Sequence, residues 1–253
     1  MTFGVTDLDG TLLFTSPAAP GLREVERLPS GRAVHMHEEA FIGLKELADT
    51  GQLLVATSRT VSQFQHATLP SLPYVLAANG LDLIEHGHVM AEWRNEQCHL
   101  LSVDAEPWDR LQTHCEDMFN AFGLRQSVRE PWLAACVGER EAVAKCGLRL
   151  QSAVSEAGWK AVAVGRKLYV LAKGLDKQLT VGRALRRIGQ RGYVAAGDSA
   201  MDLGMLTAAE RALVPRESDL ATASISSMTV TRASGPAAGP EIIDWFRTAA
   251  AAR

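Results

Sequence analysis

The sequence predicts an α/β fold built on a parallel sheet with helices on both faces, and three observations support this prediction. Short apolar stretches with the length of buried strands alternate with stretches of helical period along most of the chain. Several of the apolar stretches end at acidic or other polar residues, as strands do at the carboxyl edge of a parallel sheet. Residues 83–170 break this alternation, which predicts an inserted α+β unit.

The amino-terminal elements begin with the strand Phe3–Thr6, which is apolar enough to be buried. The Pro- and Gly-rich stretch from Pro17 to Gly31 is predicted as a loop. Glu38–Asp49 has apolar residues at helical spacing and Gly51 as its stop signal, which predicts a helix. The remaining elements here are the strand Leu53–Ala56, the helix Val61–Ala67 and the strand Tyr74–Ala78.

The insert is predicted from hairpins and helices. These are the hairpin of Leu81–Ile84 and His88–Glu92, the helix Trp108–Phe122, the strand Leu133–Val137, the helix Glu139–Ala157, and the hairpin of Val162–Val164 and Leu168–Leu171. Core packing is favoured over ligand stacking for its tryptophans, Trp93, Trp108, Trp132 and Trp159. Residues 1–82 and 171–253 form the other domain, completed by the helix Leu179–Ile188, the strand Tyr193–Ala196, the helix Met201–Leu206, the strands Ala212–Val214 and Thr229–Thr231, and the helix Glu241–Thr248.

Charge and composition exclude several classes of function. The formal net charge is −3, with 26 Lys and Arg against 29 Asp and Glu, so no nucleic-acid partner is expected. No apolar run is long enough to span a bilayer and the first residues lack a secretory signal, which predicts a cytoplasmic protein with no membrane partner. The cysteines have no CxxC spacing, which predicts reduced thiols; they are Cys98, Cys115, Cys136 and Cys146.

The sequence also contains two His-x-His pairs, His35 with His37 and His86 with His88. Neither pair has a third ligand in register, which predicts surface strands and not a zinc site.

Acidic pairs follow two of the predicted strands. Asp7 and Asp9 come directly after the first strand, and their spacing points both side chains the same way on an extended chain. Asp198 follows the strand Tyr193–Ala196, and Asp202 lies one helical turn further on. Two like charges about 4 Å apart cost about 4 kcal/mol at an effective dielectric of about 20, so these acids require a compensating cation. Mg²⁺, which binds carboxylate oxygens and substrate phosphate, is the cofactor that this set predicts.

Other polar residues at strand ends are candidates for substrate contacts. Thr57, Ser58 and Arg59 follow the second apolar strand, where Arg59 either contacts the leaving group of a substrate or forms a salt bridge with an acid. Asn79 follows the third strand and either contacts substrate or forms a tight turn with the next glycine. Lys177 opens a predicted helix, so its ammonium and the adjacent N–H groups can face an anion.

Together these motifs resemble the haloacid dehalogenase superfamily of phosphatases over essentially the whole chain. Asp-Leu-Asp-Gly-Thr-Leu-Leu from Asp7 matches the first motif, Thr57 the second, Lys177 the third and Gly197–Asp202 the fourth, in the family's order. The resemblance implies a Rossmann-like core from both ends of the chain and a cap for substrate specificity at residues 83–170. Cof-type, sucrose-phosphate and mannosyl-3-phosphoglycerate phosphatases are similar to this arrangement. Residues 57–63, 79–80 and 87–93 also look like hydrolases of this superfamily from tellurium-resistance gene clusters.

The resemblance implies a role for each matched residue. Asp7 is the implied nucleophile and becomes an aspartyl phosphate, while Asp9 protonates the leaving oxygen and then deprotonates water. Thr57 and Lys177 are implied to hold the transferring phosphoryl group. The implied substrate contacts are Gly10, Thr57, Ser58, Arg59, Asn79 and Lys177, and the implied Mg²⁺ ligands are Asp7, Asp9 through its backbone carbonyl, Asp198 and Asp202.

The sequence departs from the family pattern at Met201, where Asn is usual, and this is expected to alter the orientation of the fourth motif without loss of the metal. Lys173 is a rival for the third motif, but Lys177 fits the pattern Gly-x-Asp-Lys. In the insert, Arg125, Arg129, Arg166 and Lys167 either bind a second anionic group or are solvated charges.

The predicted function is hydrolysis of a small phosphorylated metabolite, preferably a sugar phosphate, by a monomer or homodimer. A phosphotransferase or phosphomutase is the first alternative. A catalytically silent regulatory binding protein is the second, and the intact set of acids argues against it.

Overall fold

The chain forms two compact units, which the computed structural model describes over residues 2–222 and 228–251. The first unit comprises Met1–Met90 and Lys177–Arg253, so it contains both ends of the chain. The second unit comprises Ala91–Asp176. The matched motifs of the sequence all belong to the first unit.

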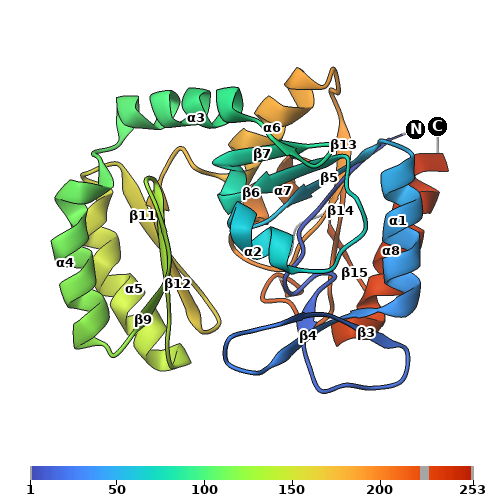
Figure 1. Cartoon of the computed structure of the whole chain (residues 1–253), viewed down its shortest axis with the longest axis horizontal. Helices are drawn as coiled ribbons and strands as arrows, with labels where there is room; N and C mark the ends of the chain where they lie inside the picture. Colours follow the sequence, from blue (N-terminus) through green and yellow to red (C-terminus); the bar gives the residue numbers. More distant parts are fainter. Residues whose placement is uncertain (1, 223–227, 252–253) are drawn as a thin grey trace. The chain divides into compact units, whose positions relative to one another are not determined.

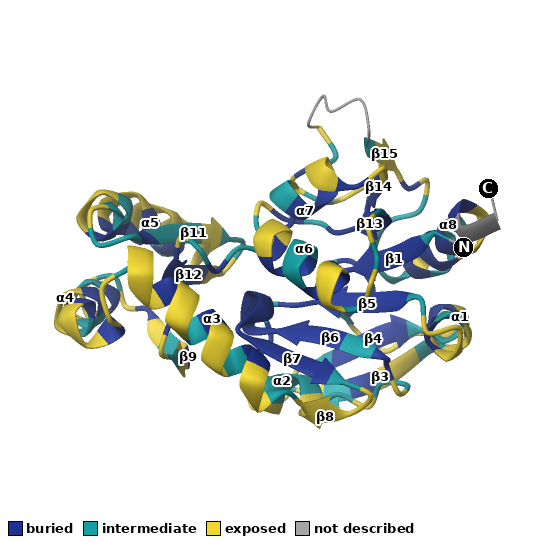
Figure 2. Cartoon of the chain, turned by 90° about the horizontal axis from the view of Figure 1, so that it is seen from above, coloured by how far each residue is buried: buried dark blue, intermediate teal, exposed yellow. Residues whose placement is uncertain are grey.

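The first unit is built on an eight-stranded sheet in the order β15-β14-β13-β1-β5-β6-β7-β8. Every neighbouring pair from β15 to β6 is parallel, which confirms the predicted fold class. β1 and β5 are buried along their whole length (Figure 2), as expected of strands covered on both faces. The bounds of the parallel strands are β1 Phe3–Thr6, β5 Leu53–Ala56, β6 Tyr74–Ala77, β13 Tyr193–Ala196, β14 Arg211–Val214 and β15 Met228–Val230.

Helices cover both faces of this sheet (Figure 1). α1 (Glu38–Asp49) and α8 (Ala238–Ala251) pack side by side on one face, where Gly43 allows close approach because a Cβ atom there would collide with Ile243. α6 (Lys177–Arg187) and α7 (Leu203–Ala208) lie on the other face. The short helix α2 (Val61–His66) follows β5 and begins with a capping box formed by Thr60 and Gln63.

The sequence-based assignment of the first hairpin to the insert was wrong. β7 (Asp82–Glu85) pairs antiparallel with β6, and β8 (His88–Val89) pairs with β7, so both strands extend the sheet of the first unit. The predicted strand His88–Glu92 is therefore cut short, and the chain enters a helix at Ala91. A hairpin pattern in the sequence fixes which strands pair with each other but not which sheet they join.

The stretch predicted as a loop forms a second, three-stranded antiparallel sheet in the order β2-β4-β3. Its strands are β2 Phe14–Thr15, β3 Leu22–Arg27 and β4 Ala33–His37. The Pro and Gly residues mark the turns between these strands, and the many charges of β3 hide its strand character. His35 was predicted to be on the surface but is buried, with its Nδ1 atom 3.3 Å from the hydroxyl of Ser16.

The second unit has a four-stranded antiparallel sheet in the order β11-β12-β10-β9. Its strands are β9 Arg125–Glu130, β10 Leu133–Val137, β11 Trp159–Val164 and β12 Lys167–Ala172, and its helices are α3 Ala91–Asp104, α4 Trp108–Ala121 and α5 Arg140–Ser155. Neither α3 nor β9 was predicted, because both are mostly polar and bury few side chains. All four tryptophans of the insert are buried, and the rings of Trp108 and Trp132 lie 5.4 Å and 6.0 Å from that of Trp159, which confirms core packing.

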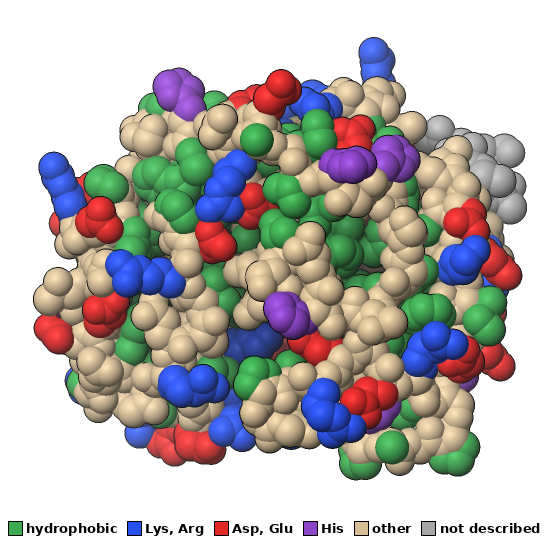
Figure 3. Space-filling view, viewed as in Figure 1, with side chains coloured by type: hydrophobic (Ala, Val, Ile, Leu, Met, Phe, Trp, Pro, Cys, Tyr) green, Lys and Arg blue, Asp and Glu red, His purple; other side chains and the backbone are tan. Residues whose placement is uncertain are grey.

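The charged surface, the lengths of the helices and the cysteines bear on the expectations from composition. Lys and Arg side chains are interspersed with Asp and Glu on the face shown in Figure 3. No described helix is both long and apolar enough to cross a membrane. All four cysteines are free, and burial raises the pKa of the Cys115 and Cys136 thiols to about 12.

The packing of α1 gives a matched pair of stability predictions. Leu44 is fully buried, whereas Ile42 in the same helix is 50% exposed. Leu44→Ala should lower the free energy of unfolding by about 2–5 kcal/mol, because it leaves a cavity in the core. Ile42→Ala should change it by less than about 0.5 kcal/mol. Urea unfolding followed by circular dichroism measures both, and equal effects would contradict the packing described here.

Candidate active site

Carboxylates from the two ends of the chain meet at the carboxyl edge of the parallel sheet. β1 lies beside β13, and the Asp7 N–H donates to the Ala196 carbonyl at 2.9 Å, so Asp7 and Asp198 follow neighbouring strand ends. Carboxylate oxygens of Asp7, Asp198 and Asp202 all lie within 4.8 Å of one another. The structure thus brings together three of the four acids that the sequence singled out.

Lys177 compensates part of this negative charge. Its Nζ atom lies 2.9 Å from Oδ1 of Asp7 and 2.5 Å from Oδ1 of Asp202, and its side chain is almost completely buried. Burial by itself lowers the pKa of Lys177, but the adjacent Asp202 and Asp7 carboxylates outweigh it and hold the pKa above its ordinary value. The rival Lys173 instead donates to the backbone carbonyl and the hydroxyl of Ser155.

The pKa values of two acids in this cluster are raised despite the nearby Lys177. Burial, followed by repulsion from Asp202, raises the pKa of Asp7 to about 7, against the opposing effect of Lys177. Burial and then repulsion from Asp7 and Asp202 raise the pKa of Asp198 to about 9. Both carboxyls are therefore disfavoured as anions unless another positive charge is present.

The first motif shapes the chain around Asp198. Gly10 has a φ of +85°, and a Cβ atom at this position would collide with the Asp198 carboxylate. The Thr11 hydroxyl donates to Oδ1 of Asp198 at 3.2 Å. Gly10 is thus required for the close approach of Asp198, a role additional to the substrate contact predicted for it.

The fourth motif is held by Ser199. Oδ2 of Asp202 accepts hydrogen bonds from the Ser199 hydroxyl at 2.8 Å, from its N–H at 3.0 Å and from the Asp198 N–H at 3.3 Å. Asp202 is fully buried and binds Lys177 through its other oxygen. These contacts orient the motif without an amide side chain at Met201.

Asp9 is not part of the cluster of Asp7, Asp198 and Asp202 and forms an ion pair with Arg59. Nε and Nη2 of Arg59 donate to the two carboxylate oxygens of Asp9 at 2.7 Å and 2.8 Å. Nη1 of Arg59 donates to Oε2 of Glu26 in β3 at 2.6 Å. Of the two interpretations left open for Arg59, the structure shows the salt bridge. Glu26 was not identified from the sequence, because no local pattern connects β3 with the strand ends.

Thr57 and Ser58 lie at the end of β5, next to β1. Thr57 is fully buried, and its Oγ1 accepts a hydrogen bond from the Arg59 N–H at 3.2 Å. Its own N–H donates to the Leu76 carbonyl at 2.9 Å, which ties this strand end to β6. Ser58 is partly buried. The substrate contacts implied for both residues stay predictions.

Asn79 occupies a strained turn at the end of β6. Ala78, Asn79 and Gly80 have φ values of +49°, +57° and +95°, of which only the glycine adopts such a value without cost. The Thr180 hydroxyl donates to the Asn79 carbonyl at 3.0 Å, and a Cβ atom at Gly80 would collide with Thr180. The Asn79 side chain is buried, and neither atom of its amide has a hydrogen-bond partner among the described residues. Both the turn and the substrate contact predicted for Asn79 are compatible with these observations.

The charged residues singled out in the second unit are mainly surface groups. Arg166 donates to Glu139 at 2.8 Å and Arg129 to Gln112 at 2.5 Å, and both arginines are exposed. Arg125 and Lys167 are exposed as well. This placement favours solvated charge over a built anion site.

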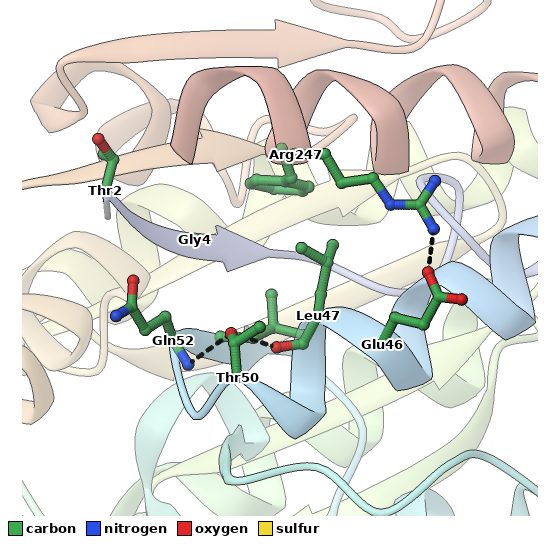
Figure 4. Close-up of a pocket in the computed structure, with 9 residues that line it drawn as sticks. Thr2, Gly4, Glu46, Leu47, Thr50, Gln52 and Arg247 are labelled. Atoms are coloured by element: carbon green, nitrogen blue, oxygen red, sulfur yellow. Dashed lines mark hydrogen bonds and ion pairs between the residues drawn. The ribbon is translucent and has the colours of Figure 1, made fainter. Parts of the chain in front are cut away.

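A pocket of about 260 Å³ lies at the opposite, amino-terminal edge of the sheet (Figure 4). Its polar rim includes an ion pair between Arg247 and Glu46, which is drawn as a dashed line. The residues that line it are Thr2, Gly4, Glu46, Leu47, Thr50, Gln52, Leu53, Phe246 and Arg247. None of them belongs to the motifs, and the cluster of Asp7, Asp198 and Asp202 lies at the other end of β1.

The donor set of this cluster fits a magnesium ion. Three carboxylates crowd one site, and burial together with their mutual repulsion raises the pKa values of Asp7 and Asp198 despite Lys177. A hard divalent cation with oxygen ligands supplies the missing charge. Asp7 and Asp198 are the residues suited to hold it directly, because both oxygens of Asp202 already accept hydrogen bonds.

Comparison with known proteins identifies the fold. No protein-family model matches the chain, and no curated protein matches it in sequence. Solved structures do match: sucrose-phosphatase from Synechocystis sp. PCC6803, in complex with sucrose and phosphate, has a TM-score of 0.67 and 17% identity over 97% of this chain and 98% of that chain. The C-terminal domain of C. albicans trehalose-6-phosphate phosphatase has a TM-score of 0.69 and 12% identity over 97% of this chain and 91% of that chain. A sugar phosphatase of haloacid dehalogenase subclass IIB has a TM-score of 0.63 and 14% identity over 99% of each chain.

The chain therefore has the fold of the haloacid dehalogenase-like phosphatases, as its motifs predicted. At these identities the likeness is one of fold.

The pKa values of the acids predict how stability depends on pH and Mg²⁺. Because the pKa values of Asp7 and Asp198 are raised, these two carboxyls bind more protons in the metal-free folded protein than in the unfolded chain from about pH 4 to about pH 9. The free energy of unfolding should therefore fall as the pH rises through this range in EDTA. Mg²⁺ should reverse this loss, so the increase in Tm with MgCl₂ should be larger at about pH 9 than at about pH 6, where protons compete with the cation.

Differential scanning fluorimetry measures these shifts, with Asp198→Asn as the variant and Asp49→Asn, an exposed acid of α1, as the control. Asp198→Asn should lose most of the Mg²⁺ effect, and Asp49→Asn should keep it. A Mg²⁺ effect that persists in Asp198→Asn would place the cation elsewhere.

Proposed function

We propose that the chain is a magnesium-dependent phosphomonoester hydrolase that acts on a small phosphorylated metabolite through an aspartyl-phosphate intermediate. The observation that carries this proposal is the meeting of Asp7, Asp198 and Asp202 with Lys177 at one edge of the sheet. A buried lysine and a candidate cation site next to a carboxylate nucleophile suit the transfer of an anionic phosphoryl group.

Asp7 is the proposed nucleophile. Lys177 fixes Oδ1 of Asp7 at 2.9 Å, and the other oxygen attacks phosphorus. A bond forms between this oxygen and phosphorus while the bond from phosphorus to the leaving oxygen breaks. Water then attacks phosphorus and releases inorganic phosphate, which returns Asp7 to its carboxylate form.

The transferred phosphoryl group needs positive charge and hydrogen-bond donors around it. Lys177 supplies an ammonium, and the hydroxyl of Thr57 is placed at the adjacent strand end. When bound, Mg²⁺ neutralises the negative charge of the phosphoryl oxygens. The raised pKa of Asp7 makes this charge important, because only the deprotonated carboxylate attacks phosphorus.

Asp9 is the proposed acid and base. It donates a proton to the leaving oxygen in the first step and takes a proton from water in the second. Its carboxylate is about one-third exposed, so a substrate can reach it. Arg59 donates to both oxygens of Asp9, so in this arrangement Asp9 is a carboxylate, the form that takes a proton from water. When Asp9 carries the proton that it donates to the leaving oxygen, the oxygen that holds this proton gives up its hydrogen bond from Arg59. This pairing assigns Arg59 to Asp9 and not to the substrate.

A sugar phosphate is the proposed substrate class. Two of the solved structures with this fold are named for phosphorylated disaccharides, sucrose phosphate and trehalose 6-phosphate. We propose that the second unit acts as the cap that selects the leaving group. We also propose a cytoplasmic location with neither nucleic acid nor membrane as a partner.

The proposal predicts that purified protein releases inorganic phosphate from at least one member of a panel of sugar phosphates in the presence of MgCl₂ and not in EDTA. Asp7→Asn should reduce kcat by at least about 10³-fold, because an amide does not replace the carboxylate nucleophile. Asp49→Asn, the same substitution on the exposed surface, should retain the wild-type rate.

Release of phosphate by Asp7→Asn at a rate close to that of the wild type would refute the assigned nucleophile. A protein that binds a phosphorylated metabolite without turning it over would instead support a silent regulatory role. Phosphate release that requires an acceptor or a bisphosphate would support a phosphotransferase or a phosphomutase.

A further inference from the structure

Arg59 joins two carboxylates that lie far apart in the sequence. It donates two hydrogen bonds to Asp9, at 2.7 Å and 2.8 Å, and one to Glu26 at 2.6 Å. The side chains of Arg59 and Glu26 are only 8% and 11% exposed. Charge-assisted hydrogen bonds of this length in a partly dehydrated place fix the orientation of a guanidinium group strongly.

Arg59 has few donors left for any other role. A guanidinium carries five N–H groups, and Nη1 of Arg59 also reaches the Gln63 carbonyl at 3.5 Å. Moving Arg59 toward a substrate would break its pairing with two acids and leave the mostly buried Glu26 carboxylate unpaired, which is costly. Arg59 is therefore built to hold Asp9 in place.

The strand that carries Glu26 is irregular at this point. The register between β3 and β4 shifts between Glu24 and Glu26, so Val25 is an extra residue, or β-bulge. Val25 is buried in the core of the first unit, and its carbonyl accepts the Thr68 N–H at 2.7 Å. A bulge redirects the side chains that follow it. Here it lets Val25 enter the core and Glu26 bind Arg59.

We propose that Glu26 is a positioning residue of this active site, which acts through Arg59 to fix the direction of the Asp9 carboxylate. This inference rests on the proposed function, in which Asp9 protonates the leaving oxygen. Without Glu26 the guanidinium loses its charged partner at Nη1 and keeps there only the distant Gln63 carbonyl, so it turns about its remaining bonds and Asp9 turns with it. Proton transfer is sensitive to small errors of position, so the effect should be kinetic.

The chain offers a matched control for Glu26. Glu24 lies two residues away in β3 and pairs with Arg27, but both of these side chains are well exposed. Glu24→Gln removes the same charge from the same strand without touching Arg59. It should leave kcat/KM unchanged.

The test compares two phosphate esters that differ in their need for a general acid. Values of kcat/KM, which report the step that releases the leaving group, are measured for a sugar phosphate hydrolysed by the wild type and for 4-nitrophenyl phosphate. Glu26→Gln should lower kcat/KM by about 10- to 100-fold on the sugar phosphate and by less than about 3-fold on 4-nitrophenyl phosphate, whose leaving group needs little protonation. Asp9→Asn should show the same pattern with a larger loss. The ratio of the two values does not depend on how much of each preparation is folded.

Two further results decide whether Glu26 acts through Arg59. In an Arg59→Gln background, Glu26→Gln should have almost no additional effect on the ratio, because the connecting group is already gone. The inference is overturned if Glu26→Gln leaves the ratio of kcat/KM on the two esters unchanged. It is also overturned if Glu26→Gln causes its full loss in the Arg59→Gln background. If the wild type hydrolyses neither ester, the proposed function fails as well. If the wild type and Asp9→Asn behave as described and Glu26→Gln does not, only the role of Glu26 is rejected.

Discussion

The concentration of negative charge at one edge of the sheet is the constraint on which the rest of this structure depends. Asp7, Asp198 and Asp202 lie within a few ångströms of one another, and Lys177 is the cation that the protein itself places between two of them. The strand order brings these residues together, because β1 lies directly beside β13. Burial and mutual repulsion raise the pKa values of Asp7 and Asp198, and Lys177 offsets only part of this effect.

Several features that look unrelated serve this charge cluster. Gly10 has no side chain, which leaves room for the Asp198 carboxylate. The Ser199 hydroxyl donates a hydrogen bond to the oxygen of Asp202 that Lys177 does not bind. On the neighbouring strand ends, Arg59 compensates the charge of the Asp9 carboxylate. The fold thus separates two kinds of acid, those suited to bind a cation and one suited to move a proton.

The sequence predicted the parallel sheet and the acid cluster for one physical reason. Buried parallel strands appear as short apolar runs, and each acid of the cluster follows such a run by a few residues. What the sequence could not predict depends on contacts between distant polar segments. β3 is charged and irregular, so neither its strand character nor the contact of Glu26 with Arg59 leaves a local pattern. α3 was missed because Trp93, Gln97 and Leu101 are the only residues it buries.

The most direct test is to locate a metal in a crystal of this protein grown with MnCl₂, which replaces Mg²⁺ and gives an anomalous signal. A peak bound by the carboxylates of Asp7 and Asp198, with Lys177 still paired to Asp202, is the predicted result. A peak at another place, or none while these carboxylates keep their present positions, would contradict the central claim that acids from both ends of the chain share one cation.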